Sequence, residues 1–313
     1  MSAEIDPRAL MSFRAVAEHG SFAAAARELG WTQPALSGQV RRLEEGLGAA
    51  LVVRTVKGVR LTDAGTRLLH YAELIDGHLA RAARDVAGIV AGEARTVRVV
   101  AFPSACTSIV APAMSELLAR PGGAPGTTID LEQQEPTSVP ELLRRGAADV
   151  ALVFRHDAQE LRGAEEEFAS TEIGWDPLQL IVSARRGDAR AQRTRRMAHH
   201  AGDRWVAGCP SCRQHFLRIA EREGFAPDIR HSTDDYMVVQ ELVARDMCVS
   251  VVPRLSLVSY RHPGIRAYGL EEGDGRRLMI LTARDESRAE VRAVVAALQR
   301  SAARVLDPEP GEG

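Results

Sequence analysis

The sequence predicts an α/β protein that begins with an all-helical unit, and three patterns along its 313 residues support this fold class. Apolar residues recur at helical spacing through the N-terminal part, interrupted once by a short alternating stretch. One long amphipathic helix is expected next. Beyond residue 97, short apolar runs of strand type alternate with helical stretches, which is typical of parallel sheets with helices packed on both faces.

Two helices are expected first. Asp6 followed by Pro7 is a typical helix start, because proline fits the first helical position. Apolar residues then recur at helical spacing, namely Leu10, Phe13, Val16 and Ala17. The Ser21 hydroxyl can cap a second helix, which Gly30 ends because glycine adopts the left-handed backbone without a steric penalty. The small core is expected to be completed by Phe22, Leu29 and Trp31.

A third helix follows a tight turn and has two different faces. Thr32 is its expected cap, and Pro34 is tolerated in the first turn. An apolar stripe that should face inward contains Leu36, Val40, Leu43 and Leu47. A second stripe has nothing large and apolar, and it contains Pro34, Ser37, Gly38 and Arg41. Such a pair of helices forms a helix-turn-helix, whose second helix enters the DNA major groove, and Gln33, Ser37 and Arg41 are suited to contacting bases there.

Residues 51–61 alternate valines with polar residues around Lys57 and Gly58, which predicts a two-stranded wing. Its polar side chains are placed to reach phosphates or the minor groove, and a solvated turn is the alternative interpretation. The whole chain has 40 basic and 42 acidic residues, so DNA binding has to be local. Residues 41–60 provide a local basic face with five basic and two acidic side chains, and a few cations suffice because each displaces counterions from DNA.

The run GSFAAAARELGWTQPALSGQVRRLEEGLGAALVVRT, followed by GVRLTDAG, resembles the N-terminal domain of LysR-type transcriptional regulators. QPALS, RRLEEGLG and the RT before the basic turn are its most specific parts. Gly38 departs from the family, which commonly has Arg there, and Val52 stands where Phe is common. We predict a DNA-binding face made of Ser21, Thr32, Gln33, Pro34, Ser37, Gly38, Arg41, Arg54, Thr55, Lys57 and Arg60. The alternative is a helical subdomain that binds a protein.

The long helix starts near Thr62 and has an apolar stripe with a heptad-like alternation of three and four residues. The stripe contains Ala64, Leu68, Ala72, Ile75, Leu79, Ala83 and Val86. Nothing in the wing unit is available to cover so long a stripe, so we expect it to pair with a second copy of the chain. Two recognition helices would then read two half-sites of one operator. The resemblance implies the same linker helix and further assembly to a tetramer.

The C-terminal part repeats strand and helix patterns. The expected strands include VRVVA, TIDLE, DVALVF, PLQLIVS, RWVAG, PDIRHS, CVSVVP, IRAY and LMILT. Residues 97–300 resemble the LysR effector domain, which is related in fold to periplasmic binding proteins and has two subdomains around a cleft. We therefore divide the chain into a winged helix-turn-helix at 1–61, a linker helix at 62–92, an effector domain at 93–306 and a disordered tail at 307–313. Subdomain I is expected at about 93–170 and 268–306, and subdomain II at about 171–267.

A small-molecule effector is expected in that cleft, beyond the carboxyl ends of the strands, where helix N-termini present free N–H groups. This rule selects Ser104, Thr137, Ser138, Arg155, Gly208, Cys209 and Thr233. Ser104 and Thr137 fall where the family commonly has effector-binding hydroxyls. Hydroxyl and N–H groups suit a small anion, typically a carboxylate, with Arg155 as its candidate partner. The alternative is that the hydroxyls only cap helices.

Cys209-Pro-Ser-Cys212 follows an apolar strand and opens a helix, a context that lowers thiol pKa and that dithiol redox centres share. A thiol redox-sensing regulator is therefore an alternative reading. A zinc site with His215 as a third ligand is disfavoured, because structural zinc needs a fourth ligand and the sequence pattern does not indicate which residue that would be. We predict no metal and no cofactor.

The function predicted is a DNA-binding transcriptional regulator that responds to a small molecule as a homodimer or homotetramer, with RNA polymerase as a further candidate partner. No apolar run reaches the roughly 18 residues of a membrane span, and no signal peptide precedes the first helix, so a cytoplasmic location is expected. An α/β enzyme or ligand-binding module is the alternative from another class. The sequence disfavours an enzyme because it has no G-x-S-x-G elbow, no phosphate-binding loop and no H-E-x-x-H motif.

Overall fold

The computed structural model describes residues 5–56, 58–91, 95–119, 127–157, 160–186, 196–270 and 274–306. Within the chain, contacts define two units: residues 1–92 with 144–147, and residues 93–143 with 148–313. The predicted tail at 307–313 lies outside the described residues, and so does Lys57 of the predicted wing. In the described part of the chain, no helix combines the length and apolarity needed to cross a bilayer.

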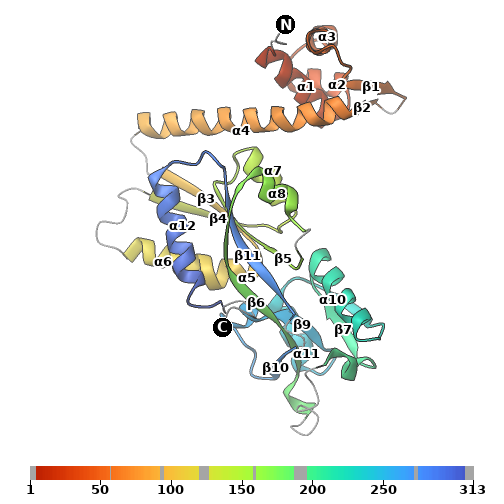
Figure 1. Cartoon of the computed structure of the whole chain (residues 1–313), viewed down its shortest axis with the longest axis vertical. Coiled ribbons are helices and arrows are strands. Elements are labelled where there is room, and N and C mark those ends of the chain that lie inside the picture. Colours follow the sequence, from red (N-terminus) through yellow and green to blue (C-terminus); the bar gives the residue numbers. More distant parts are fainter. Residues whose placement is uncertain are drawn as a thin grey trace. The chain divides into compact units, whose positions relative to one another are not determined.

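The N-terminal unit has the predicted order of three helices, a hairpin and a long helix. Its elements are α1 (Pro7–His19), α2 (Phe22–Glu28), α3 (Gln33–Leu47), β1 (Val52–Thr55), β2 (Gly58–Leu61) and α4 (Asp63–Ala91) (Figure 1). The predicted caps are confirmed, because Ser21 Oγ accepts from the Ala24 N–H at 3.0 Å and Thr32 Oγ1 accepts from the Ala35 N–H at 3.4 Å.

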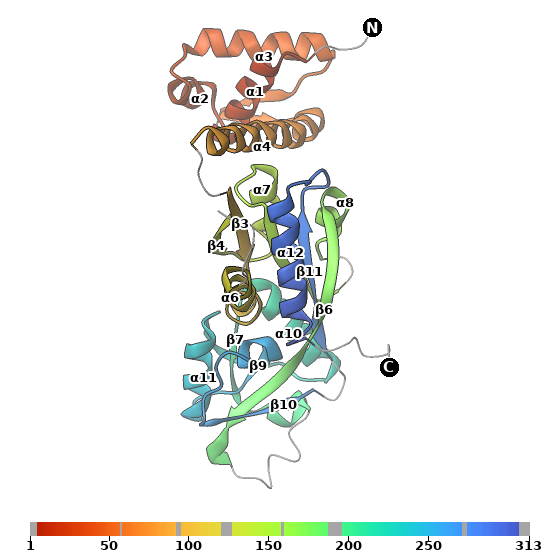
Figure 2. The same cartoon turned by 90° about the vertical axis from the view of Figure 1, so that its left-hand side faces the viewer.

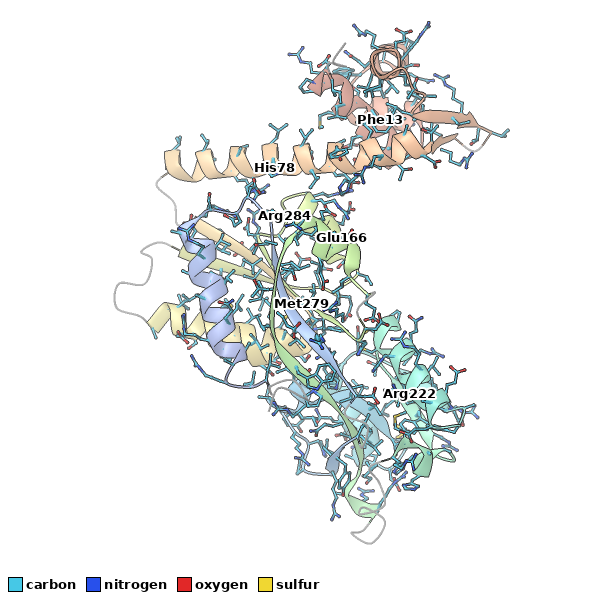
Figure 3. All side chains as sticks on the ribbon, viewed as in Figure 1. Phe13, His78, Glu166, Arg222, Met279 and Arg284 are labelled. Atoms are coloured by element: carbon cyan, nitrogen blue, oxygen red, sulfur yellow. The ribbon has the colours of Figure 1, made fainter. Side chains whose placement is uncertain are left out.

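The core of this unit is formed by the inner faces of α1, α2 and α3. Phe13, labelled in Figure 3, is fully buried, and Leu36, Val40 and Leu43 of the predicted stripe are buried with it. Phe22 also belongs to this core. The expectation for two other residues was wrong, since Leu29 is 40% and Trp31 is 41% exposed. Both follow the last turn of α2, where the chain turns outward before α3 begins.

The wing is held against the end of α1 by a close backbone contact. The Val59 N–H donates to the Gly20 carbonyl oxygen at 2.8 Å. Gly58 has φ +128°, and a Cβ built there would lie 2.4 Å from the same oxygen. A second hydrogen bond connects α3 to the start of the wing, because Glu44 Oε1 accepts from the Leu51 N–H at 2.8 Å. Glycine at position 58 is therefore required by both conformation and space.

The second unit is built on a seven-stranded sheet in the order β10-β6-β11-β5-β3-β4, with β9 pairing β6, and a two-stranded sheet of β7 and β8. The strands are β3 (Arg95–Ala101), β4 (Thr127–Gln133), β5 (Val150–Arg155), β6 (Ala169–Ser183), β7 (Arg204–Ala207), β8 (Asp228–Ser232), β9 (Ser250–Pro253), β10 (Ile265–Gly269) and β11 (Gly275–Thr282). The helices are α5 (Pro103–Ala105), η1 (Cys106–Val110), α6 (Ala111–Ala119), α7 (Val139–Arg144), α8 (Arg162–Glu167), η2 (Ala184–Arg186), η3 (Met197–His200), α10 (Pro210–Arg222), α11 (Tyr236–Ala244), η4 (Arg254–Leu257) and α12 (Ala289–Ala302).

The expectation of parallel sheets was only partly right. β3 pairs in parallel with β4 and β5, but β11 runs antiparallel to both β5 and β6. β6 is 15 residues long, pairing with β11 through residues 169–177 and with β9 and β10 through residues 178–183. Figure 2 shows it as one long strand shared by both halves of the unit. The sheet is therefore mixed, and β6 joins the two predicted subdomains.

Alternating residues of the sheet serve two cores. Val150, Leu152 and Phe154 of β5 pack with α6 and α12, whereas Ala151 and Val153 pack with α7 and α8. Figure 1 shows these helix pairs on opposite sides of the sheet. Met279, labelled in Figure 3, lies on the central strand β11 and belongs to the second of these cores. Two further clusters pack around β6, α10 and α11.

Candidate functional site

The predicted DNA-binding face lies on the outer side of α3. Gln33, Pro34 and Arg41 are exposed, and Ser37 and Gly38 are half-buried. A Cβ at Gly38 would have no heavy-atom neighbour within 4 Å among the described residues, so glycine is not required there by packing. The polar face is therefore open within its own unit, as a groove-reading helix requires.

Arg54 of the wing is fixed against this face. Its Nη2 donates to Ser37 Oγ at 2.9 Å, and its guanidinium carbon lies 4.8 Å from the centre of the Phe22 ring. A hydrogen bond and a cation–π contact thus hold one wing arginine beside α3. Thr55 Oγ1 donates to the Gly58 carbonyl oxygen at 3.2 Å, and Arg60 is exposed.

Three other residues of the predicted face make contacts within or at the ends of their own helices. Ser21 and Thr32 cap α2 and α3. Arg41 pairs with Glu45 one turn later, at 2.8 Å, and both side chains are largely exposed. Such an exposed pair contributes little to stability, so Arg41 is available to exchange Glu45 for a phosphate.

The second candidate site is a cleft in the larger unit, where three helix N-termini meet. The space between its lining atoms is about 450 Å³, and the lining side chains leave little of it free. Its lining comes from α5, α10, α11, β5, β9, β11 and the loops beside them. It includes Phe102, Pro103, Glu135, Phe154, Gly208, Cys209, Cys212, Thr233, Asp234, Tyr236, Ser250 and Arg276. Helix N-termini carry partial positive charge, which favours an anion at this point.

Arg276 is the cation of this cleft, and sequence reasoning missed it. It is 1% exposed, and its Nε and Nη2 lie 3.0 Å and 2.9 Å from Asp176 Oδ2. Its Nη2 also donates to Ser104 Oγ at 2.7 Å. The rings of Phe102 and Phe154 have their centres 4.6 Å and 4.4 Å from its guanidinium carbon. Arg276 is therefore held rigidly by one carboxylate, one hydroxyl and two aromatic rings.

The predicted effector residues divide into two groups. Gly208, Cys209 and Thr233 line the cleft, and Ser104 is joined to it through Arg276. Thr137, Ser138 and Arg155 do not line this cavity. Ser138 Oγ donates to Gln134 and to the Glu135 carbonyl oxygen, and Arg155 pairs with Glu165 at 3.4 Å.

Acidic groups also face the cleft. Burial raises the pKa of Glu135 above its ordinary value. Asp234 is exposed at the rim, next to Asp235, which caps α11 by accepting from the Met237 and Val238 N–H groups. Since Asp176 already balances Arg276, and Glu135 and Asp234 also face the cleft, a ligand that combines an anionic group with a hydrogen-bond donor complements it better than a purely anionic one.

Two histidines stack beside the cleft. The rings of His156 and His215 are 4.1 Å apart at an angle of 11°, and His156 Nδ1 lies 3.3 Å from the Gly275 carbonyl oxygen. Burial lowers the pKa of His156 to about 3 and that of His215 to about 4. Both rings are therefore neutral near pH 7, which allows them to stack without charge repulsion.

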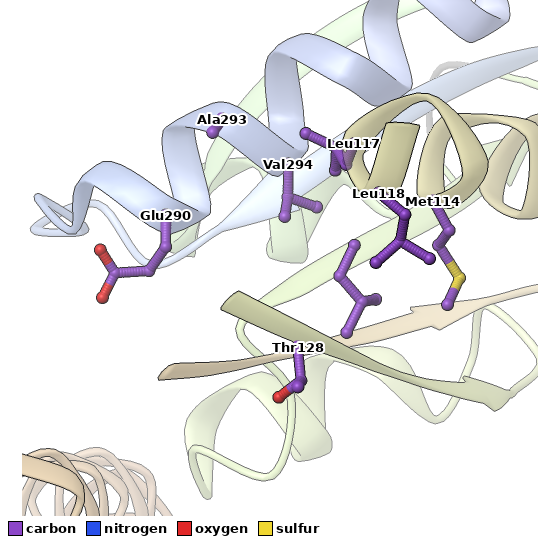
Figure 4. Close-up of a pocket in the computed structure, with 8 residues that line it drawn as sticks. Met114, Leu117, Leu118, Thr128, Glu290, Ala293 and Val294 are labelled. Carbon is purple, nitrogen blue, oxygen red and sulfur yellow. The ribbon is translucent and has the colours of Figure 1, made fainter. Parts of the chain in front are cut away.

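A larger cavity lies between α6, β4 and α12 and is mainly apolar. The space between its atoms is about 750 Å³, and it is lined by Met114, Leu117, Leu118, Thr128, Ile129, Glu290, Ala293 and Val294 (Figure 4). In Figure 4, Glu290 lies at the end of the cavity away from Met114. Because few polar groups converge on this cavity, the smaller cleft around Arg276 is the better candidate for a specific small-molecule site.

Comparisons with known proteins agree with this architecture. A family model described as "LysR substrate binding domain" matches residues 91–303, and one described as "Bacterial regulatory helix-turn-helix protein, lysR family" matches residues 7–66. The small neutral protease regulatory protein of Streptomyces coelicolor is 30% identical over 302 residues, which cover 95% of this chain and 86% of that protein. The HTH-type transcriptional regulator AlsR of Bacillus subtilis is 27% identical over 250 residues, covering 79% and 80% of the two chains.

Solved structures share the fold. The crystal structure of CbnR, a LysR family transcriptional regulator, covers 95% of this chain and 99% of its own, with a TM-score of 0.58 and 21% identity. Full-length CbnR complexed with its target DNA covers 95% and 100%, with a TM-score of 0.56 and 22% identity. With both family models matched in order along the chain, the protein belongs to the LysR family and is a LysR-type transcriptional regulator, with a helix-turn-helix unit followed by an effector-binding domain.

Proposed function

We propose that this regulator reads its operator with the outer face of α3 and the wing beside it. The observation that carries the proposal is the uncovered polar face at Gln33, Pro34 and Ser37, with Arg54 fixed next to it. Gln33 and Ser37 would meet base edges, and Arg41, Arg54 and Arg60 would meet phosphates. Because Arg54 is already held by Ser37 and Phe22, less side-chain entropy is lost when it binds.

Salt dependence of DNA binding tests this proposal. The affinity of the full-length protein for the DNA upstream of its own gene would be measured by fluorescence anisotropy over a range of salt concentrations. Each phosphate contact steepens the slope of log affinity against log salt by about 0.9. Arg54→Ala should therefore weaken binding and reduce the slope by about one contact. Arg292→Ala, which removes an exposed arginine of α12, is the matched control.

Two outcomes would contradict the proposal. One is binding without a steep salt dependence. The other is an equal loss for Arg54→Ala and Arg292→Ala, because the effect would then follow net charge instead of position.

We further propose that α4 pairs with the α4 of a second copy, giving a dimer that is the unit of operator binding and of any tetramer. Apolar side chains are exposed along this helix: Tyr71 47%, Ile75 40%, Leu79 55%, Val86 60% and Val90 82%. They recur at spacings of four and seven residues, which places them along one stripe. Ala72, from the same predicted stripe, is buried within the N-terminal unit.

Self-association would be measured by sedimentation equilibrium. Leu79→Asp should weaken it, because a carboxylate would be buried without a partner in the helix pair. Gly88→Asp is the matched control: residue 88 lies nine positions further on and hence on the opposite side of the helix. A Cβ at Gly88 has no heavy-atom neighbour within 4 Å in the part of the chain that the structure describes, so the added side chain has space. If the two variants associate equally well, α4 does not form the interface.

The effector proposed for the cleft is a small carboxylate that also carries a hydrogen-bond donor. Its carboxylate would face Arg276 and the N-terminus of α10, and its donor would face Glu135. Because little free space remains in the cleft, ligand entry has to accompany an opening movement, and the effector would shift the balance between open and closed forms.

A thermal-shift screen of small carboxylates, with and without an amino group, tests the cleft. Compounds that bind the folded protein raise its melting temperature. Thr233→Val should remove the shift, whereas Thr137→Val, the same change outside the cavity, should retain it. The opposite pattern would move the site toward Thr137 and refute the present assignment.

Since its operator is part of the bacterial chromosome, we place the regulator in the cytoplasm and propose that it acts by binding, without catalysing a reaction. RNA polymerase is the proposed downstream partner, because a regulator bound beside a promoter acts on transcription through that enzyme.

A further inference from the structure

The cleft contains a pair of thiols that the effector proposal does not use. Cys209 Sγ and Cys212 Sγ lie 3.0 Å apart, and both side chains line the cavity. Cys209 is the N-cap of α10 and Cys212 belongs to its first turn. The other two cysteines lie outside this cavity: Cys106 Sγ donates to the Ala101 carbonyl oxygen, and Cys248 is buried.

The two thiols of the pair are chemically unequal. The hydrogen bond from Cys212 lowers the pKa of Cys209 below its ordinary value, and the backbone N–H of Cys212 acts in the same direction. The same hydrogen bond, together with burial, raises the pKa of Cys212 well above its ordinary value. Burial raises the pKa of Cys106 and of Cys248 to about 11. Among four cysteines, Cys209 alone is biased toward the reactive thiolate.

The positions of Cys209 and Cys212 need little change for a disulfide to form between them. A disulfide has a sulfur–sulfur distance of about 2.05 Å, so the two Sγ atoms must approach by about 1 Å. Both residues sit in one helical turn, so side-chain rotation and a small shift of the first turn of α10 are enough. Cys209 and Cys212 both line the cavity and are half-buried, so a reagent that enters the cleft meets the pair. Cys209 is the N-cap of α10, which places its sulfur at the positive end of that helix.

We propose that Cys209 and Cys212 form a redox-active dithiol in the effector cleft, with Cys209 as the attacking sulfur and low-molecular-weight disulfides as the class of oxidant. The Cys209 thiolate attacks one sulfur of the disulfide, forming a mixed disulfide and releasing one thiolate. Cys212 then attacks Cys209 Sγ, its proton passes to the second leaving thiolate, and the protein disulfide is formed. One small disulfide is reduced to two thiols for each dithiol oxidised.

The test uses the full-length, reduced protein, incubated with oxidised glutathione and analysed by intact mass spectrometry without reductant. The wild type should lose two hydrogen atoms and gain no glutathione. Cys212→Ser should instead retain one glutathione on Cys209, because the resolving sulfur is missing. Cys209→Ser should remain unmodified under the same conditions. Cys106→Ser and Cys248→Ser are matched controls and should behave as the wild type.

The proposal is overturned if the wild type stays reduced, or if Cys209→Ser and Cys212→Ser are modified to the same extent. Either result would mean that the pair only packs at the start of α10. The readout is a mass and does not depend on DNA or effector binding, so its failure is distinct from failure of the proposed function.

Discussion

Replacing Arg276 by methionine should destabilise the effector-binding unit strongly. The substitution keeps an unbranched side chain between Phe102 and Phe154 but removes the positive charge. Asp176 would then keep a buried carboxylate whose remaining described donor is the Leu255 N–H, at 2.8 Å. The mechanism is thus an unpaired buried charge, and the volume change is secondary.

The expected magnitude follows from the contacts that are lost. Arg276 makes two short contacts with Asp176 and one with Ser104, all buried, and two cation–π contacts. Removing one partner of a buried ion pair typically costs about 3–5 kcal/mol. Burial already raises the pKa of Asp176, and without Arg276 it should rise further. The carboxylate can then escape its penalty by protonation, so the loss should be smaller in mildly acidic than in mildly alkaline buffer.

Urea unfolding followed by tryptophan fluorescence is a suitable assay. Of the three tryptophans, Trp175 and Trp205 lie in this unit and Trp31 lies in the N-terminal unit, so a Trp31→Phe background isolates the signal. The double variant Arg276→Met with Asp176→Asn removes both charges and keeps an acceptor for Leu255. It should be more stable than Arg276→Met alone. A single variant that costs less than about 1 kcal/mol, or a double variant that is no better, would refute the reasoning.

Three further predictions concern glycines and histidines. Gly38→Ala should stabilise the N-terminal unit by about 0.5–1 kcal/mol, measured by thermal unfolding, because alanine favours helix and the added Cβ has none of the described residues within 4 Å. Gly58→Ala should instead destabilise the wing and weaken operator affinity, because its Cβ would lie 2.4 Å from the Gly20 oxygen at φ +128°. The folded-state pKa values of His156 and His215 are depressed to about 3 and 4, so their contribution is fully present above about pH 6.5 and is lost as pH falls toward 4. Each histidine should lower the unfolding free energy by about 3 kcal/mol as the pH falls from 6.5 to 4, and a variant with leucine at both positions should show a flatter pH profile.

The outcomes that would contradict these predictions are specific. A loss of stability in Gly38→Ala would mean that the glycine has a packing role that the structure does not show. Normal operator affinity in Gly58→Ala would mean that the wing can move away from Gly20 at little cost. An unchanged pH profile after loss of both histidines would assign the acid sensitivity to other groups.

Local sequence signals were sufficient to predict the order of the helices and strands of the N-terminal unit and the caps of two of its helices. Ser21 and Thr32 cap the helices where expected, because capping is decided within three residues. Leu29 and Trp31 were misassigned because their exposure depends on the direction in which the chain leaves α2, which periodicity does not specify. Asp246 adopts φ +61°, a left-handed backbone conformation that aspartate tolerates better than most residues.

Long-range pairing limited the prediction of the effector cleft. Arg276 binds Ser104 from 172 positions away, and no local pattern links the two residues. The available signal was an arginine inside the largely apolar run GRRLMILT, which would have to be buried with a partner. Arg155, at the end of its own strand, was the cation that the sequence indicated for the cleft. In the structure it pairs instead with Glu165, ten residues later. The antiparallel β11 was also hidden, because strand direction is set by connections and not by composition.

Asp176 and Arg276 are opposite each other on β6 and β11, at the place where β6 passes from one half of the effector unit to the other. A charge brought to this point by a ligand would act on the one strand that both halves share, so a change in the pairing of Asp176 with Arg276 would reach both halves at once. Few contacts would then need to change for a small metabolite to alter the conformation of the effector-binding unit.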